Sequence, residues 1–120
     1  MARWIVDGMN VIGSRPDGWW RDRPGAMKRL VGELESLDGE VAVVFDGRPF
    51  EIESDRVDVA FASRSGPDAA DDDIAARVAS DRDPSSLTVV TSDGDLERRV
   101  RASGANVEGA SAFRRRLDRG

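Results

Sequence analysis

The stretch Val41-Ala42-Val43-Val44-Phe45-Asp46-Gly47 places five apolar residues directly before an acid and a glycine. A short apolar run without alternation is typical of a strand buried on both faces, as in a parallel sheet covered by helices. The same arrangement occurs in Trp4-Ile5-Val6-Asp7-Gly8 and, with two residues inserted before the acid, in the run 87–94. These three strands, separated by segments of helical periodicity, predict an α/β fold with a central, mostly parallel sheet.

Weaker elements complete the expected order along the chain. Residues 56–61 alternate, with Val57, Val59 and Phe61 on one side, which indicates an edge strand, and a short last strand is expected at 106–107. Apolar spacing and Pro, Gly and Asp signals predict helices from Pro24 to just before Gly39, then at 69–80 with Asp68 as N-cap, 95–103 and 111–117. The stretch 11–22 is expected to be a long loop, and residues 1–120 to form one domain.

Two residue types are missing altogether: the 120 residues include neither histidine nor cysteine. This excludes a Ser-His-Asp triad, a histidine zinc site and a thiol nucleophile. No apolar run approaches the ~20 residues of a membrane span, and the first ten residues do not resemble a signal peptide, so a soluble cytoplasmic protein without membrane contact is expected. Because histidine and cysteine are both absent, any catalysis must use carboxylates or a hard metal ion.

Three acids are expected to meet at one edge of the sheet. Asp7, Asp46 and Asp93 each follow a buried strand, and the carboxyl ends of parallel strands lie together beside the ligand crevice of such folds. A glycine follows each acid, which permits a sharp turn or a close backbone approach.

A fourth acid comes from the run Asp71-Asp72-Asp73 at the start of the second expected helix. Asp71 shares a helix face with Ile74 and Val78, three and seven positions later, so it is expected to point toward the sheet while Asp73 faces water. Acids are also favoured near any helix N-terminus, but this explains Asp72 and Asp73 better than Asp71. Clustered carboxylates call for a cation, and a donor set of oxygens alone favours Mg²⁺ or Mn²⁺.

In order along the chain, these motifs resemble the YacP-like NYN domain of the PIN-like nuclease superfamily. They are Asp7-Gly8-Met9-Asn10-Val11-Ile12-Gly13, Val43-Val44-Phe45-Asp46-Gly47, Val57-Asp58-Val59-Ala60-Phe61, Ala70-Asp71-Asp72-Asp73-Ile74 and Val90-Thr91-Ser92-Asp93. Met9 stands where the family usually has Tyr. The resemblance covers about residues 4–117 and implies a three-layer α/β/α fold and a metal-dependent endoribonuclease.

The resemblance also implies roles for single residues. Asp7, Asp46, Asp71 and Asp93 match metal ligands, and Asn10 matches an amide that orients metal or phosphate. Asp95 matches the second acid of an Asp-x-Asp found in many PIN-like proteins, although a helix-start acid explains it equally well. A two-metal hydrolysis of the RNA phosphodiester is the resulting hypothesis, with single-stranded RNA as substrate and the ribosome as a candidate partner.

Arginines are the expected phosphate contacts, because Lys28 is the only lysine. Arg48 and Arg64 neighbour the acidic edge, and Arg98 follows Asp93 by five residues. Residues 97–120 hold seven arginines against three acids in a chain of net charge −5, which predicts either a polyanion-binding end or ordinary solvated helices. Trp19 and Trp20 are candidates for stacking on bases or for packing on the first helix.

Other classes of protein are also compatible with acids at strand ends. A non-catalytic RNA-binding or partner-binding module could keep the fold. A receiver-like phosphoacceptor usually has a strand-end lysine, which is absent here. A haloacid-dehalogenase phosphatase needs Asp-x-Asp at the first strand, and a Toprim domain expects a Glu there.

Overall fold

The computed structural model describes residues 2–66 and 68–119 and contains one five-stranded sheet. Its strands are β1 (Arg3–Asp7), β2 (Glu40–Phe45), β3 (Val57–Phe61), β4 (Leu87–Val90) and β5 (Asn106–Glu108). All four neighbouring pairs are parallel, and the order is β3-β2-β1-β4-β5. The expected parallel sheet and the edge position of residues 57–61 are therefore confirmed.

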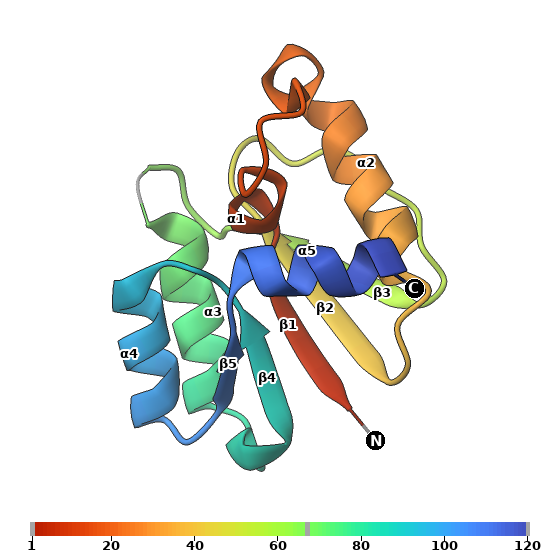
Figure 1. Cartoon of the computed structure of the whole chain (residues 1–120). Coiled ribbons are helices and arrows are strands. Elements are labelled where there is room, and N and C mark those ends of the chain that lie inside the picture. Colours follow the sequence, from red (N-terminus) through yellow and green to blue (C-terminus); the bar gives the residue numbers. More distant parts are fainter. Residues whose placement is uncertain (1, 67, 120) are drawn as a thin grey trace.

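Within the described residues, five α-helices connect and cover the strands. They are α1 (Gly8–Ile12), α2 (Arg23–Leu34), α3 (Ala69–Ala79), α4 (Gly94–Ala102) and α5 (Ala110–Arg119), with 3₁₀ turns at Trp19–Arg21 and Pro84–Ser86. Figure 1 shows α1, α2 and α5 on one face of the sheet and α3 and α4 on the other. No helix of the described residues is both long and apolar enough to cross a bilayer.

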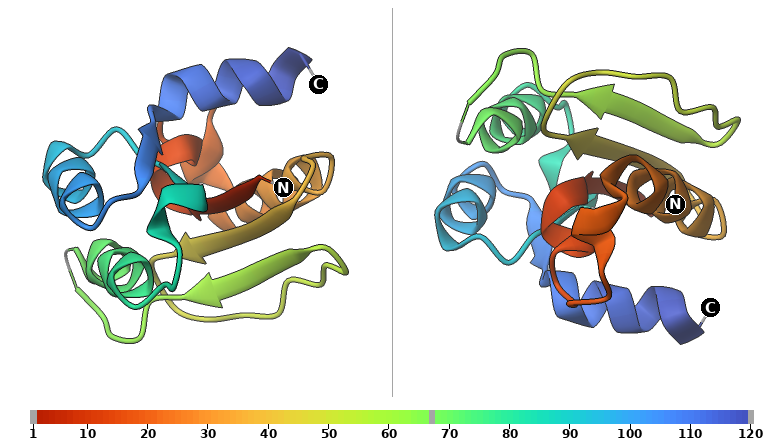
Figure 2. Two further views of the ribbon diagram at one scale, coloured as in Figure 1. Left: turned by 90° about the horizontal axis from the view of Figure 1, so that it is seen from below. Right: turned by 90° about the horizontal axis from the view of Figure 1, so that it is seen from above.

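The side-chain alternation of the strands builds a separate core on each face. On β1, Val6 joins the core under α1, α2 and α5, whereas its neighbour Ile5 joins the core under α3 and α4. Val43 and Val44 of β2 divide in the same way. Strands covered on both sides need apolar residues at consecutive positions, which explains the unbroken runs in the sequence. The result is a three-layer α/β/α arrangement, visible along the strands in Figure 2.

The first long helix ends earlier than the apolar spacing predicts. Leu37 continues the periodic pattern, but α2 ends at Leu34. Arg56 donates hydrogen bonds to the carbonyl oxygens of Glu35, Leu37 and Gly39, at 3.2, 2.8 and 3.2 Å. These bonds satisfy carbonyl groups of a chain that has left the helix, so a side chain from a distant segment helps to set this boundary.

The expected loop at 11–22 is also partly helical. Its beginning belongs to α1, a single turn that buries Val11 and Ile12. A Cβ on Gly8 would lie 2.4 Å from Cε1 of Phe45, so only glycine permits this close approach of α1 to β2. Gly47 is required for a different reason, since its φ is +103°. The glycine after Asp93 has neither a positive φ nor a tight contact, so it is not needed for the turn.

Candidate functional site

Four aspartates from four separate segments line one cavity at the carboxyl edge of the sheet. Asp7 ends β1, Asp46 follows β2, Asp71 lies in the first turn of α3 and Asp93 immediately precedes α4. The cavity has a volume of about 280 Å³, and Met9, Asn10 and Asp68 complete its lining. The right panel of Figure 2 looks down on this edge, where α1 lies close to the ends of the strands. The structure thus brings together the four acids expected from the strand ends and the helix face.

Asp7 lies deepest and is only 4% exposed. Its Oδ2 accepts a hydrogen bond of 2.9 Å from the buried Thr91 hydroxyl. Burial raises the pKa of Asp7 to about 7 against the opposing effect of this hydrogen bond, and the negative charges of Asp71, Asp46 and Asp93 raise it further. Near neutral pH, a cation that enters the cavity would therefore stabilise the ionised form of this carboxyl group.

The pKa of Asp71 is raised by the same causes as that of Asp7. Burial raises its pKa to about 6, with Asp93, Asp68 and Asp46 adding to the rise and Arg99 opposing it. The helix-face argument from Ile74 and Val78 is confirmed in geometry, because both are buried while Asp71 lines the cavity. Asp73, by contrast, does not simply face water: it accepts hydrogen bonds from the backbone and hydroxyl of Ser63 at 2.6 and 2.9 Å.

The other two acids are held by backbone donors. Oδ1 of Asp46 accepts a hydrogen bond of 3.1 Å from the amide of Ala70, which ties β2 to the start of α3. Oδ1 of Asp93 accepts one of 2.9 Å from Leu96 and caps α4. In each of these carboxylates, one oxygen fixes the orientation of the side chain. The second oxygen makes no hydrogen bond with the described part of the protein.

Asn10 and Thr91 connect the parts of the site. Oδ1 of Asn10 accepts a hydrogen bond of 2.8 Å from the amide of Ser92, joining α1 to the loop after β4. Thr91 donates to Asp7 and also accepts a bond of 3.1 Å from the amide of Asp93. Asn10 is predicted from the sequence, whereas Thr91 is not; its only signal there is a hydroxyl residue between a buried strand and its strand-end acid.

The carboxylate oxygens of the cavity suit a hard cation, but the acidic side chains do not converge closely on a single point. Within residues 2–66 and 68–119, no group of three or more acidic side chains is arranged to hold a metal ion directly. Mg²⁺ commonly binds through one or two carboxylates and keeps several waters, so two carboxylates per ion would meet its requirement. The chemistry of the donors therefore fits Mg²⁺ or Mn²⁺, with water completing the coordination.

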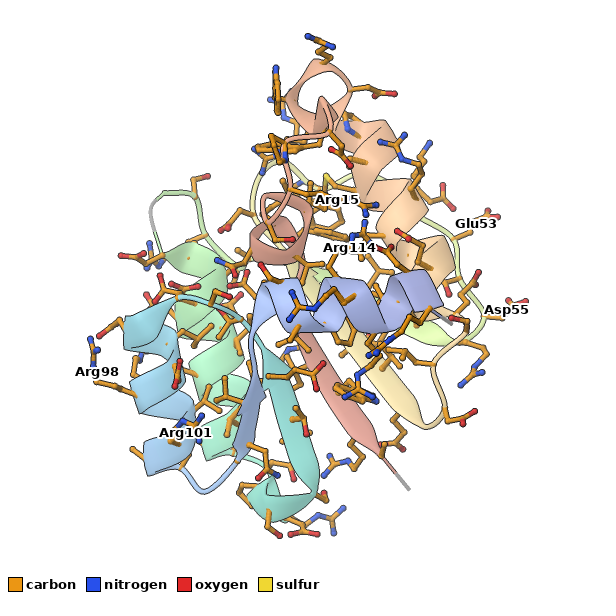
Figure 3. All side chains as sticks on the ribbon, in the orientation of Figure 1. Arg15, Glu53, Asp55, Arg98, Arg101 and Arg114 are labelled. Atoms are coloured by element: carbon orange, nitrogen blue, oxygen red, sulfur yellow. The ribbon has the colours of Figure 1, made fainter. Side chains whose placement is uncertain are left out.

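The lining of the acidic cavity does not include four residues expected near the site, which are Asp95, Arg98, Arg64 and Arg48. Asp95 is on the exposed first turn of α4, where its Oδ1 lies 3.4 Å from Nη2 of Arg98. Figure 3 shows Arg98 projecting outward from α4. Arg64 pairs with Asp72, which also accepts a hydrogen bond of 2.9 Å from Arg99, and these two partners lower the pKa of Asp72.

Arg48 and the two tryptophans are also candidates for contact with RNA. Arg48 is exposed and lines a second cavity that shares Asp46 with the acidic one. Trp19 packs against the core that contains α2, which matches the packing alternative. The ring of Trp20 contacts the ring of Trp19 edge to face, and Trp20 is 55% exposed. Trp20 is the more exposed of the pair, and the guanidinium of Arg21 lies over its ring at 5.9 Å.

A larger cavity of about 570 Å³ lies at the opposite edge of the sheet. Arg3 is its most constrained charge, paired with Asp81 at 2.7 Å and with Glu40 at 3.2 Å. Five of its six charged side chains form ion pairs with one another, and the sixth, Arg56, donates to backbone carbonyl groups. The four acids at the carboxyl edge, by contrast, form no ion pair with a described residue. The carboxyl edge is therefore the better candidate for chemistry.

An all-parallel sheet between two helical layers, with an acidic cavity at its carboxyl edge, defines a three-layer α/β domain that has the donors of a hard-metal site. The chain belongs to the family of the YacP-like NYN domain, whose model matches residues 4–120. Membership of this family indicates a nuclease-type, RNA-related function.

Solved structures confirm the fold. The crystal structure of Rae1 (YacP) from Bacillus subtilis superposes with a TM-score of 0.80 at 24% identity, covering 99% of this chain and 75% of that one. A point mutant of the same protein gives a TM-score of 0.79 at 24% identity, with 99% and 76% covered. No curated protein matches the chain.

Proposed function

We propose that this protein is an endoribonuclease that hydrolyses RNA phosphodiester bonds with Mg²⁺ or Mn²⁺ at the acidic cavity. The observation that carries the proposal is the convergence of Asp7, Asp46, Asp71 and Asp93 from four segments onto one cavity. Membership of the YacP-like NYN family supports the choice of RNA. An acidic cavity repels a phosphodiester unless a cation intervenes, so the same geometry supports metal dependence.

The residues of the chain would divide the work between holding the cation and holding the RNA. The cation would be held by Asp7, Asp46, Asp71 and Asp93. Three of these carboxylates are oriented by hydrogen bonds from Thr91, Ala70 and Leu96. When bound, such an ion would polarise the phosphoryl oxygen and offset the negative charge on the phosphate oxygens. Asn10 would contribute an amide beside the phosphate, and Arg48 a guanidinium on the Asp46 side.

Single-stranded RNA is the form of substrate that we propose. The acidic cavity is small, and its acids come from the ends of strands and the beginnings of helices, so a flexible backbone can reach them more readily than a stiff duplex. Unpaired bases also expose the faces that apolar and aromatic side chains bind.

A circular single-stranded RNA incubated with Mn²⁺ tests this function, because only an endonuclease can open a circle. We expect the wild-type protein to linearise it and Asp7→Asn or Asp93→Asn to do so at least about 100-fold more slowly, since several kcal/mol of charge stabilisation is lost. Asparagine can still accept the hydrogen bond from Thr91 or cap α4, so both variants should fold. Asp38→Asn, at an exposed acid, is the matched control. Intact circles with the wild-type protein, or equal rates in all variants, would refute the proposal.

A non-catalytic RNA-binding module is the second candidate. It is favoured by the absence, among the described side chains, of three acids arranged to hold an ion directly. In that case RNA would bind with the same affinity in EDTA and in Mn²⁺, and the circular substrate would remain closed. The two candidates therefore give opposite results in the same assay.

A further inference from the structure

A second cavity adjoins the acidic one and has a different chemical character. It has a volume of about 470 Å³ and is lined by the beginning of α2 and by residues 46–50 after β2. Asp46 belongs to the lining of both cavities. Figure 1 shows α1 and the beginning of α2 above the strands, on the side toward which the strand arrows point. A ligand at the acids could therefore extend into this neighbouring space.

The lining of the second cavity is apolar, with charge supplied by two arginines. Pro24, Met27, Pro49 and Phe50 provide its apolar surface. The Phe50 ring packs against Phe61 at a centroid distance of 5.6 Å, and Nζ of Lys28 lies over it at 5.9 Å. A flat apolar ligand can therefore bind without first ordering this aromatic side chain.

Arg23 and Arg48 give the cavity a positive charge that the acidic cavity lacks. Both are exposed and line the cavity, and Nη2 of Arg23 donates a hydrogen bond of 3.0 Å to the carbonyl oxygen of Asp46. This bond holds the Arg23 guanidinium beside the residue that the two cavities share. A ligand that suits the space must combine a flat apolar part with a negative charge near Asp46.

We propose that this second cavity binds the nucleobase of the RNA nucleotide next to the phosphate at the acidic cavity. A nucleotide has the required combination: its base can pack among Phe50, Met27 and the two prolines, while its phosphate meets Arg48 and Arg23. The inference rests on the proposed function, since it takes the acidic cavity as the site of the scissile phosphate. It adds a subsite that binds a base beside the phosphodiester bond that is cut.

Methionine methyl resonances can test this subsite without any cleavage. Met9 lines the acidic cavity and Met27 the second one, so the two methyl groups report separately on the two spaces. The protein labelled with [methyl-¹³C]methionine is titrated in EDTA with a nucleoside 5′-monophosphate and, separately, with ribose 5-phosphate. We expect the Met27 resonance to shift with the nucleotide and to move little with the sugar phosphate.

Two variants and a matched control define the contribution of the cavity. Phe50→Leu keeps apolar volume but removes the aromatic face, and Arg48→Gln removes a charge; each should weaken nucleotide binding on the order of tenfold. Arg82→Gln, at an exposed arginine that forms no ion pair with the described residues, should bind as the wild type does. Equal Met27 shifts with both probes, a shift of Met9 alone, or unchanged affinity in both cavity variants would overturn the inference. Failure of the circular-RNA assay with intact Met27 shifts would refute the proposed function and leave a nucleotide-binding cavity beside an acidic site that does not cut RNA.

Discussion

The carboxyl group of Asp7 is almost fully shielded from water yet faces three other acids. Its ordinary pKa of 3.8 rises to about 7, chiefly because burial disfavours the charged form. The Thr91 hydroxyl opposes this rise but does not cancel it. In the metal-free protein, ionised Asp7 therefore destabilises the folded state. The same charge would be stabilising once a cation balances it.

We expect the stability of the metal-free protein to depend on pH through Asp7. Its folded pKa lies above its unfolded pKa, so the contribution to stability is fully present below about pH 4 and is lost as the pH rises through about 7. Asp7→Asn removes this titration. Its stability relative to the wild type should therefore increase by on the order of 2 kcal/mol between pH 5 and pH 8, measured by urea unfolding in EDTA.

Asp38→Asn is again the appropriate control, since Asp38 is exposed on the turn before β2. Its effect on the free energy of unfolding should be small and nearly the same at the two pH values. A pH-independent difference between Asp7→Asn and the wild type would contradict the assignment of the raised pKa to Asp7.

At the scale of elements, the strands were easier to predict than the helix boundaries. Runs such as Val41–Phe45 are apolar because both faces of the sheet are covered, and that requirement is visible locally in the sequence. The end of α2 depends on Arg56, and α1 depends on the fit of Gly8 against Phe45. Both are contacts between distant segments, so no local pattern could reveal them.

The residues of the candidate site also divide into those that a local pattern predicts and those that depend on contacts between distant segments. The acids at strand ends and the inward face of Asp71 could be predicted, because strand direction and helix periodicity fix where these side chains point. Thr91 was missed because its role appears only when β4 lies beside β1. The outward position of Asp95 follows from its place on α4, next to Arg98, rather than from its spacing to Asp93.

The contact between α5 and α2 contains an ion pair of a buried arginine and a half-buried glutamate, and the two members should respond differently to removal. Arg114 is 9% exposed and donates a hydrogen bond of 2.9 Å to Glu33, but its Nε is buried without a partner in the described structure. Figure 3 shows Arg114 on the side of α5 that faces α2. Arg114→Met should change the free energy of unfolding by less than about 1 kcal/mol, because it removes the costly group itself.

Glu33→Ala should cost about 2 kcal/mol, because it leaves a buried guanidinium unpaired. Urea unfolding of both variants measures the difference, with Arg115→Met, at an exposed position of the same helix, as the control. A larger loss for Arg114→Met than for Glu33→Ala would show that the pair is a net source of stability for this contact.

At the scale of the whole molecule, the arginine-rich end does not form a free cationic surface. Of the seven arginines in residues 97–120, five lie in ion pairs: Arg98 with Asp95, Arg99 with Asp72, Arg101 with Glu97, Arg114 with Glu33 and Arg116 with Glu108. The chain as a whole carries a net charge of −5, which does not favour long-range attraction of RNA. Recognition of RNA should therefore depend on the edge around the acidic cavity and on its cation.

Metal binding at that edge should raise the stability of the whole fold, since the four acids come from β1, β2, α3 and α4. An ion that binds only the folded protein at 100 times its Kd adds about 2.7 kcal/mol, which corresponds to roughly 10 °C in Tm for a domain of this size. Millimolar Mn²⁺ should therefore raise the Tm of the wild type and of Asp38→Asn, measured at pH 8 against EDTA. The double variant Asp7→Asn/Asp93→Asn should lose this rise even though removal of the Asp7 charge stabilises its metal-free form, so the comparison is between shifts and not between absolute Tm values. Equal shifts in all three proteins would place the bound Mn²⁺ elsewhere and leave the raised pKa of Asp7 without a role in metal binding.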